Sequence, residues 1–274
     1  MQSEQSRREE IAVIFVIAGT EDGRELAGFL LNNGFDVTAS VVSSYGKTLL
    51  ERYEGIKIND KKLDENELVE LLLNGNVKVL VDASHPYAVN VSQNAMAACH
   101  RAKVPYIRYE RESTPLTYNK IFHVKSYEEA AKKAAELGKN IFLTTGSRNL
   151  KTFVESPALK ECNLIARILP TAEVLTECEK LGFNPQNIVA IQGRFSTELN
   201  MELFKHYKAD VIVSKDSGQI GGVDTKLIAA ERLNLPIVLI DRPAIQYDNV
   251  VSTFSDVLHF CKSPFKVDKI AENS

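Results

Sequence analysis

The sequence predicts an α/β protein built from two Rossmann-like domains with mainly parallel sheets and a ligand cleft between them. Three observations lead to this prediction. Apolar segments rich in β-branched residues alternate with helix-like segments along the chain. Short polar loops join these apolar segments, a pattern that indicates parallel strands buried on both faces. The length of 274 residues suits two modest domains, each able to bury a core.

The first series of elements defines an N-terminal domain, residues 1–118. Its first ten residues are polar and precede the sheet. The expected strands are the apolar segments 11–19, 35–42, 77–84 and 104–110. The expected helices are the segments with helical spacing of apolar residues, 21–34, 64–75 and 88–103. Gly34 should end the first helix, because glycine readily adopts the left-handed conformation found after helix C-termini.

A second series follows residues 113–120, where the pattern loosens, and defines a C-terminal α/β domain, residues 119–274. Ser126 and Glu129 form an S-x-x-E capping box that opens a helix over residues 127–138. The expected strands are 140–146, 163–170, 187–193, 209–215 and 235–243. The expected helices between them are 153–162, 172–182, 197–207 and 225–234. Pro157 weakens the first of these helices.

Composition argues against several classes of function. The formal net charge is −3, whereas general nucleic-acid binding needs a basic surface to neutralise phosphates. Four scattered cysteines without a C-x-x-C pair argue against a disulfide framework or a zinc site. From the apolar pattern near the start of the sequence we expect neither a signal peptide nor a membrane-spanning segment. We therefore expect a cytoplasmic protein with a small-molecule ligand, and leave the oligomeric state open.

Polar loops marked by glycine or proline follow the strands of both series. They lie at the carboxyl ends of the strands, where open α/β sheets bind ligands. These loops are residues 18–24, 41–46, 82–88, 144–150, 192–196, 214–226 and 241–243.

The first loop, AGTEDGR, is similar to the phosphate-binding turn of dinucleotide-binding domains. Gly19 and Gly23 are present, but Glu21 occupies the middle position of G-x-G-x-x-G. We expect Gly19, with positive φ, and Thr20 to present amides to a phosphate at the helix N-terminus. The acidic first turn opposes this, and Arg24 offsets it. The alternative is that Gly19 only makes the turn.

The second strand ends in Ser43 and Ser44. NAD-specific sites usually carry an acidic residue near this point, about 20 residues after the glycine loop, to bind the ribose. Without that carboxylate a 2′-phosphate would be tolerated, which favours NADPH and leaves NADH open.

The loop DASHPYA contains His85, which Pro86 restricts to extended geometry. One interpretation is a turn histidine bonded to the backbone. The other is a site residue that donates a hydrogen bond or a proton, for which histidine is chemically suited.

The stretch SKDSGQIGGVDTK combines glycines that permit close approach of a ligand with two lysines, Lys215 and Lys226. Lys215 ends an apolar strand and is the better candidate for binding an anion. Arg148 and Arg194 follow neighbouring strands. Together these residues predict a basic patch that steers a polycarboxylate.

These loops together resemble a known family. VIAGTEDGRELA, DASHPYAVNVSQNA, RYERES, LTTGSRNL, AIQGRFSTELN and the segment from SKDSG to LIDRP are similar to precorrin-6A and cobalt-precorrin-6A reductases of the cobalamin pathway. The resemblance extends over about residues 12 to 243. Ala18 stands where the family usually has the first glycine of its opening motif, and Arg194 stands where many members carry proline.

The resemblance implies a two-domain reductase that transfers a hydride from NADPH or NADH to a tetrapyrrole macrocycle bearing several carboxylates. His85 is then the candidate catalytic residue, with water as the other source of the proton. The residues expected to contact the cofactor are Gly19, Thr20, Arg24, Ser43, Ser44, Ser84, Gly146 and Ser147. The residues expected to contact the macrocycle are Arg148, Arg194, Lys215, Asp216, Ser217, Gly218 and Lys226. No metal ligands are expected, and the presence of cobalt in the substrate is left open.

Two other hypotheses compete with the reductase. The first is another two-domain α/β enzyme, such as a nucleotide-sugar transferase or a uroporphyrinogen-III-synthase-like protein. The second is a non-enzymatic sensor that binds a ligand in a cleft.

Overall fold

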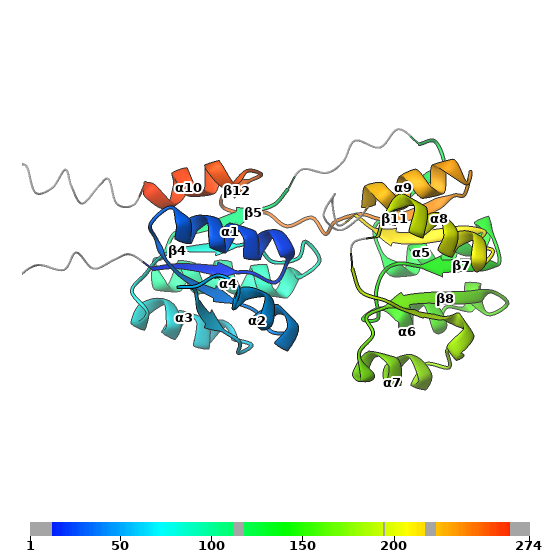
Figure 1. Cartoon of the computed structure of the whole chain (residues 1–274), viewed down its shortest axis with the longest axis horizontal. Coiled ribbons are helices and arrows are strands. Elements are labelled where there is room, and N and C mark those ends of the chain that lie inside the picture. Colours follow the sequence, from blue (N-terminus) through cyan, green and yellow to red (C-terminus); the bar gives the residue numbers. More distant parts are fainter. Residues whose placement is uncertain (1–12, 112–117, 194, 217–222, 264–274) are drawn as a thin grey trace, which may run out of the picture. The chain divides into compact units, whose positions relative to one another are not determined.

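The computed structural model describes residues 13–111, 118–193, 195–216 and 223–263 (Figure 1). The chain divides into two compact units, one made of residues 1–112 with 244–274 and the other of residues 113–243. Each unit contains a six-stranded sheet whose strand pairs are all parallel. The predicted α/β class with two parallel sheets is confirmed.

The sheet of the first unit has the strand order β12-β5-β4-β1-β2-β3. Its strands are β1 (Val13–Ile17), β2 (Asp36–Ser40), β3 (Lys57–Asn59), β4 (Val77–Asp82), β5 (Tyr106–Tyr109) and β12 (Val250–Val251). Its helices are α1 (Glu21–Asn32), α2 (Ser44–Leu50), α3 (Glu65–Asn74), α4 (Val89–Ala102) and α10 (Phe254–Lys262). This is the strand order of doubly wound dinucleotide-binding sheets.

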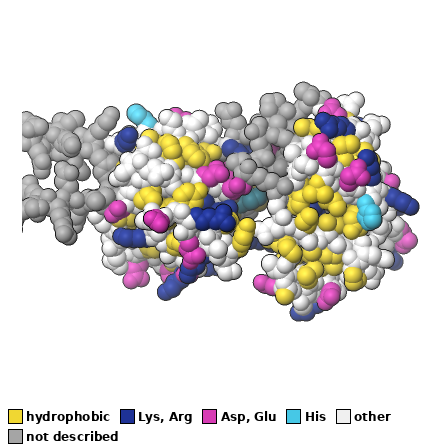
Figure 2. All heavy atoms as spheres, viewed as in Figure 1, with side chains coloured by type: hydrophobic (Ala, Val, Ile, Leu, Met, Phe, Trp, Pro, Cys, Tyr) yellow, Lys and Arg dark blue, Asp and Glu magenta, His cyan; other side chains and the backbone are white. Residues whose placement is uncertain are grey.

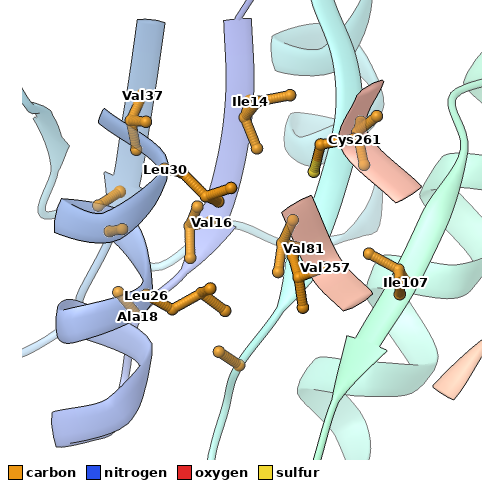
Figure 3. Packing of buried hydrophobic residues seen from close by; sticks show 14 of the residues in the cluster. Ile14, Val16, Ala18, Leu26, Leu30, Val37, Val81, Ile107, Val257 and Cys261 are labelled. Atoms are coloured by element: carbon orange, nitrogen blue, oxygen red, sulfur yellow. The ribbon is translucent and has the colours of Figure 1, made fainter. Parts of the chain in front are cut away.

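Both faces of this sheet are buried, as the continuous apolar strands predict. Ile14 and Val16 point into one core together with Leu26 of α1 and Val257 of α10 (Figure 3). Phe15, between them in sequence, points into a second core formed with α3 and α4. Successive side chains of a strand alternate between the faces, so one strand supplies both cores.

The sheet of the second unit has the strand order β6-β11-β10-β7-β8-β9. Its strands are β6 (Ile121–Val124), β7 (Asn140–Leu143), β8 (Asn163–Ile168), β9 (Ile188–Ala190), β10 (Val211–Lys215) and β11 (Ile237–Ile240). Its α-helices are α5 (Tyr127–Leu137), α6 (Leu150–Val154), α7 (Ala172–Lys180), α8 (Thr197–His206) and α9 (Val223–Arg232). Short 3₁₀ turns cover Pro157–Leu159 and Pro185–Asn187. α6 ends at Val154, and Pro157 begins the first of these turns.

The two sheets reverse their strand order at equivalent places. The reversal lies between β1 and β4 in the first unit and between β7 and β10 in the second. Ligands of open α/β sheets bind outside the carboxyl ends of the strands at such a switch point. Each unit therefore presents two loops there, 18–20 and 83–88 in the first and the residues after β7 and β10 in the second.

Most predicted elements are present, and the local signals acted as expected. Gly34 has φ of 90° after α1, and the Ser126 side chain accepts a hydrogen bond from Glu129 N at the start of α5. The second half of the capping box is displaced. Glu129 Oε2 accepts from Lys125 N at 2.8 Å, one residue before the N-cap.

Five of the α-helices and strands are not among the predicted ones: α2, β3, β6, β12 and α10. Four of them have seven residues or fewer, too short for a periodic pattern to emerge. α10 belongs to the first unit, because the chain returns to that unit after residue 243. The predicted division at residue 118 placed this segment in the second domain. Val257 and Cys261, four residues apart on α10, are both fully buried against the core of α1 (Figures 1 and 3).

No helix within the described ranges is long and apolar enough to cross a membrane.

Candidate functional site

The loop after β1 is tied to the end of β4. Thr20 Oγ1 donates to Ala83 O at 3.0 Å and accepts from Gly23 N at 3.0 Å, which caps α1. A Cβ atom on Gly23 would lie 3.0 Å from both Ala18 Cα and Ala83 O. Close packing of helix against strand is the role of the third glycine of G-x-G-x-x-G. Gly23 is therefore that third glycine, and Ala18 and Thr20 occupy the first two positions, correcting the alignment that placed Glu21 in the middle.

Gly19 is open to its surroundings. A Cβ atom built on it would meet no atom within 4 Å. The expectation of positive φ is wrong, because Gly19 is not among the residues with φ in the left-handed range. The absence of a side chain at Gly19 therefore leaves open space beside the loop. It is not required by an unusual backbone conformation.

The first turn of α1 already carries negative charge. Asp22 is 2% exposed and forms an ion pair with Arg111. Burial raises the pKa of Asp22, although the Arg111 charge opposes that shift. The neighbouring cavity measures about 10 Å³, the size of one water molecule. The charge of Asp22 offsets the helix dipole, which makes this N-terminus a weaker anion site than an uncharged one.

A buried ion pair holds the loop after β4. Arg108 of β5 is 1% exposed, and its Nη1 lies 3.0 Å from Asp82 Oδ1. Asp82 Oδ2 accepts hydrogen bonds from Ser92 Oγ at 2.6 Å and Tyr106 OH at 2.8 Å. The Asp82 carboxylate also raises the pKa of Tyr106, after burial, which keeps that phenol protonated. A fully bonded buried network of this kind fixes one loop conformation.

The network uses the hydroxyl of Ser84, an expected cofactor contact. Ser84 is 5% exposed, and its Oγ accepts a hydrogen bond from Arg108 Nη1 at 3.0 Å. Its backbone N donates to Asp82 Oδ1 at 2.9 Å. These bonds give Ser84 a structural role within the loop.

His85 follows the network and is half-buried. Its Nδ1 accepts a hydrogen bond from Tyr87 N at 3.2 Å, and the rings of His85 and Tyr87 lie 5.6 Å apart. An imidazole nitrogen that accepts a hydrogen bond carries no proton, so the neutral ring holds its proton on Nε2. This contact matches the interpretation of His85 as a turn histidine bonded to the backbone. It also leaves the Nε2 proton for a hydrogen bond to a ligand, as the second interpretation requires.

The end of β2 carries no acidic residue between Ser40 and Gly46. Ser43 caps α2, accepting from Gly46 N at 3.0 Å, and both Ser43 and Ser44 are exposed. Two apolar side chains stand exposed beside them, Val42 at 67% and Tyr45 at 55%. Arg24, half-buried on α1, completes the expected cofactor residues of the first unit.

In the second unit, the residues after β7 form an open turn. Gly146 has φ of 78°, which favours glycine, and a Cβ there would meet nothing within 4 Å. Thr145 is 3% exposed, and its Oγ1 has no hydrogen-bond partner among the described residues. Ser147 is half-buried and Arg148 is exposed.

Four cations gather at the carboxyl end of this sheet, and we call them the cationic cluster: Arg148, Arg167, Lys215 and Lys226. Lys226, in the first turn of α9, is only 5% exposed. Burial, then the charges of Arg167 and Lys215, lower the pKa of Lys226 to about 7. Burial and the Arg148 charge likewise lower the pKa of Lys215. The charges of Arg167 and Lys215 thus act on Lys226, and the charge of Arg148 acts on Lys215.

Asp216, next to Lys215 in sequence, contacts Arg242. Its carboxylate lies 3.3 Å from Arg242 Nε, and its carbonyl accepts from the same nitrogen at 3.1 Å. Figure 2 shows acidic and basic side chains intermingled on the visible surface of each unit. The cluster differs from that surface because Arg167 and Lys226 are buried.

Three predicted site residues, Arg194, Ser217 and Gly218, lie outside the described residues. The others divide between the units. Gly19, Thr20, Arg24, Ser43, Ser44, Ser84 and His85 belong to the first, and Gly146, Ser147, Arg148, Lys215, Asp216 and Lys226 to the second.

Sequence reasoning missed Asp82, Arg108 and Arg167 as members of these networks. A signal was present in each case, because a charged residue interrupts or ends an otherwise apolar strand. A cavity of about 290 Å³, lined by Cys162, Asn163 and Phe183, lies elsewhere. That cavity sits at the amino end of β8, opposite the edge where such sheets bind ligands.

Comparison with known proteins bears on both units. The family model described as "Precorrin-6x reductase CbiJ/CobK" matches residues 13–262. A cobalt-precorrin-6A reductase of Priestia megaterium is 43% identical, over 90% of this chain and 97% of that protein. A cobalt-precorrin-6A reductase of Methanocaldococcus jannaschii is 36% identical, over 85% and 92%. The solved structure "CobK precorrin-6A reductase" superposes with a TM-score of 0.74 at 25% identity, covering 93% of this chain and 97% of that one.

Proposed function

Because the chain belongs to the precorrin-6x reductase CbiJ/CobK family, we propose that it reduces precorrin-6A or cobalt-precorrin-6A in cobalamin biosynthesis. In this reaction a hydride from NADPH or NADH and a proton add across one double bond of the macrocycle, so the enzyme is an oxidoreductase acting on a CH–CH group. The match across residues 13–262 carries the proposal, because it includes both switch points.

The residues at the first switch point fit a nicotinamide dinucleotide. The strand order is the one that binds dinucleotides, and Gly23 packs α1 closely against the end of β4. The space beside Gly19 lets a ligand approach the loop backbone. Gly19, Thr20 and Arg24 are thus the candidate contacts here, with Gly146 and Ser147 in the second unit. When bound, the nicotinamide supplies the hydride.

The choice of cofactor follows from the end of β2. Without a carboxylate between Ser40 and Gly46, no charge repels a 2′-phosphate from Ser43 and Ser44. Lys47, in the next turn, forms an exposed ion pair with Asp60 at 2.7 Å and leaves the local charge near neutral. We therefore propose NADPH as the preferred cofactor, and NADH as the alternative.

The cationic cluster accounts for the macrocycle. A tetrapyrrole with several carboxylates requires charge-assisted partners, and Arg148, Lys215 and Lys226 offer them on one sheet edge. Arg194, Ser217 and Gly218 remain proposed contacts from sequence. Asp216 engages Arg242 in an ion pair, which limits its repulsion of a carboxylate.

His85 is the proposed proton source. The Tyr87 amide fixes the tautomer with the proton on Nε2, and the Asp82–Arg108 pair holds the preceding loop. To complete the addition, the ring is first protonated to imidazolium. It then gives one ring proton to the carbon next to the hydride acceptor and returns to neutral imidazole. If water donates instead, His85→Gln leaves kcat nearly unchanged.

The test is thermal unfolding of the purified protein with NADPH, NADH or neither, followed by anaerobic turnover with each macrocycle. We expect either nicotinamide to raise Tm, NADPH more than NADH at equal concentration, and the macrocycle spectrum to change only with the reduced cofactor. Turnover independent of nicotinamide would contradict the proposal and favour a synthase-like enzyme.

A further inference from the structure

Two buried cations in the second unit have no carboxylate beside them within the described part of the chain. Lys226 is 5% exposed and Arg167 is 8% exposed. Within the described residues, no ion pair includes the Lys226 ammonium. The charged groups that act on it are Arg167 from β8 and Lys215 from β10, and both are positive.

A rigid scaffold holds Arg167 in this position. Arg167 Nη1 donates to Asn200 Oδ1 at 2.7 Å, and the guanidinium lies 4.4 Å from the centre of the Phe195 ring. Asn200, which is fully buried, donates to Thr225 Oγ1 at 3.3 Å. The contacts join β8, α8 and the first turn of α9, where Lys226 follows Thr225. The neutral amide of Asn200 orients the guanidinium without cancelling its charge.

Such an arrangement is unfavourable unless an anion completes it. Burial removes each cation from water, and like charges then repel in a medium of low dielectric constant. The N-terminus of α9 adds further positive potential. On α8, Glu198 is exposed and pairs with Arg232 at 3.5 Å, so it is engaged away from Lys226. Perturbed, unbalanced charges of this kind are typical of ligand sites.

We propose that Arg167 and Lys226, with Lys215 at the strand end, form a subsite that binds one compact oxyanion. The oxyanion is a side-arm carboxylate of the macrocycle or a phosphate of the dinucleotide. The inference rests on the proposed function for these two sources, and it adds Arg167 to the binding residues and Asn200 as the residue that positions it.

Binding at this subsite takes up a proton. The pKa of Lys226, lowered to about 7 by burial and by Arg167 and Lys215, means that much of the lysine is neutral at pH 8. An oxyanion between the cations stabilises the ammonium and raises that pKa again. The complex therefore holds more protons than the separate partners between about pH 7 and the ordinary range of lysine.

The experiment measures binding of three probes to the whole protein: inorganic phosphate, NADP⁺ and a porphyrin octacarboxylate. Variants Lys226→Met and Arg167→Met are compared with Arg232→Met, an exposed cation of the same helix α9. Titration calorimetry at pH 8 in two buffers of different ionisation enthalpy reports proton uptake together with affinity. We expect Lys226→Met and Arg167→Met to lower affinity for phosphate and for one large probe by roughly tenfold or more.

The large probe that loses affinity identifies the source of the oxyanion. Loss for the octacarboxylate assigns a macrocycle carboxylate, and loss for NADP⁺ assigns a cofactor phosphate. Proton uptake should vanish in Lys226→Met and persist in Arg232→Met. Wild-type affinity of both test variants for all three probes would overturn the subsite, even with reductase activity intact. Loss of phosphate affinity in a protein without nicotinamide-dependent turnover would retain the subsite and overturn the proposed function.

Discussion

At the residue scale, the two units differ in their buried charges. The first unit pairs a buried cation with a carboxylate, whereas the second buries cations beside one another. In the first unit, Arg108 and Asp82 neutralise each other at 3.0 Å, and neighbouring hydroxyls satisfy the remaining oxygens. In the second, Arg167 and Lys226 are buried beside further cations. The paired charges stabilise a loop conformation, whereas the unbalanced ones provide attraction for an anion.

Lys215 should contribute to substrate binding. Each charge-assisted bond to a carboxylate contributes roughly 1.5–3 kcal/mol when partly desolvated. Lys215→Ala should therefore lower kcat/KM by roughly ten- to a hundred-fold in steady-state assays. Lys205→Ala, which removes a lysine that is 51% exposed, is the control. Equal, negligible effects of both substitutions would exclude Lys215 from the site.

Lys226 should make stability depend on pH in the ligand-free protein. Its pKa is about 7 in the folded protein against an ordinary value of 10.5, so the unfolded chain binds more protons between these values. The free energy of unfolding should therefore rise with pH across this window, by at most about 1.4 kcal/mol per pH unit. Below pH 7 the ammonium is charged in both states and its penalty is complete.

Lys226→Met removes this term, since methionine does not titrate. Urea unfolding of the wild type and of Lys226→Met from pH 6 to pH 10 gives the difference between them, in which other titrating groups cancel. The wild type should be the less stable of the two at pH 6 and should approach the variant as pH rises. A constant difference across the range would contradict the burial of an unbalanced ammonium.

At the scale of the element, α1 meets β4 through a glycine with no room for a side chain. Gly23→Ala places a Cβ 3.0 Å from backbone atoms of Ala18 and Ala83, which cannot move aside as a flexible side chain would. We expect a loss of roughly 1–3 kcal/mol in the free energy of unfolding, typical of overpacking. Gly19→Ala is the matched comparison, because its Cβ meets no atom. It should preserve stability and weaken nicotinamide binding, as measured by denaturant unfolding and cofactor titration.

The end of β4 depends on the pair between Asp82 and Arg108. Arg108→Met leaves the Asp82 carboxylate buried without its cation, which costs about 3–5 kcal/mol of stability. Arg101→Met breaks an exposed pair with Glu65 and should cost about 1 kcal/mol or less. Adding Asp82→Asn to Arg108→Met should recover part of the loss. Equal effects of the two arginine substitutions in chemical denaturation would refute the role of the pair.

At the scale of the whole molecule, the first unit is discontinuous in sequence. α10 returns to it after the second unit, and Tyr247 on the returning segment lies 5.3 Å from the Arg108 guanidinium. Val257→Asp should therefore destabilise the first unit and leave the second unchanged. Hydrogen exchange should accelerate in β1 and α1 but not in β10, and Ser255→Asp, at an exposed position of the same helix, should change neither. Acceleration in β10 would contradict the separate folding cores.

The sequence by itself determined the α/β class, most helices and strands, and the polar loops that follow the strands. These features depend on local signals, namely apolar periodicity, glycine after a helix and polar residues after a strand. The opening motif shows the limit of such signals. Only the close approach of Gly23 to Ala83 identifies it as the packing glycine, because that contact joins residues 60 positions apart.

The tertiary structure alone decided which unit α10 completes and which cations share a site. Val257 would be an apolar helix residue in either unit, and nothing nearby in the sequence says which of the two units its side chain packs into. Arg167 and Lys226 are likewise 59 positions apart, and their interaction follows from the order of β8, β7 and β10 in the sheet. Sequence patterns record the polarity of a position, whereas burial and charge coupling depend on distances that only the folded chain sets.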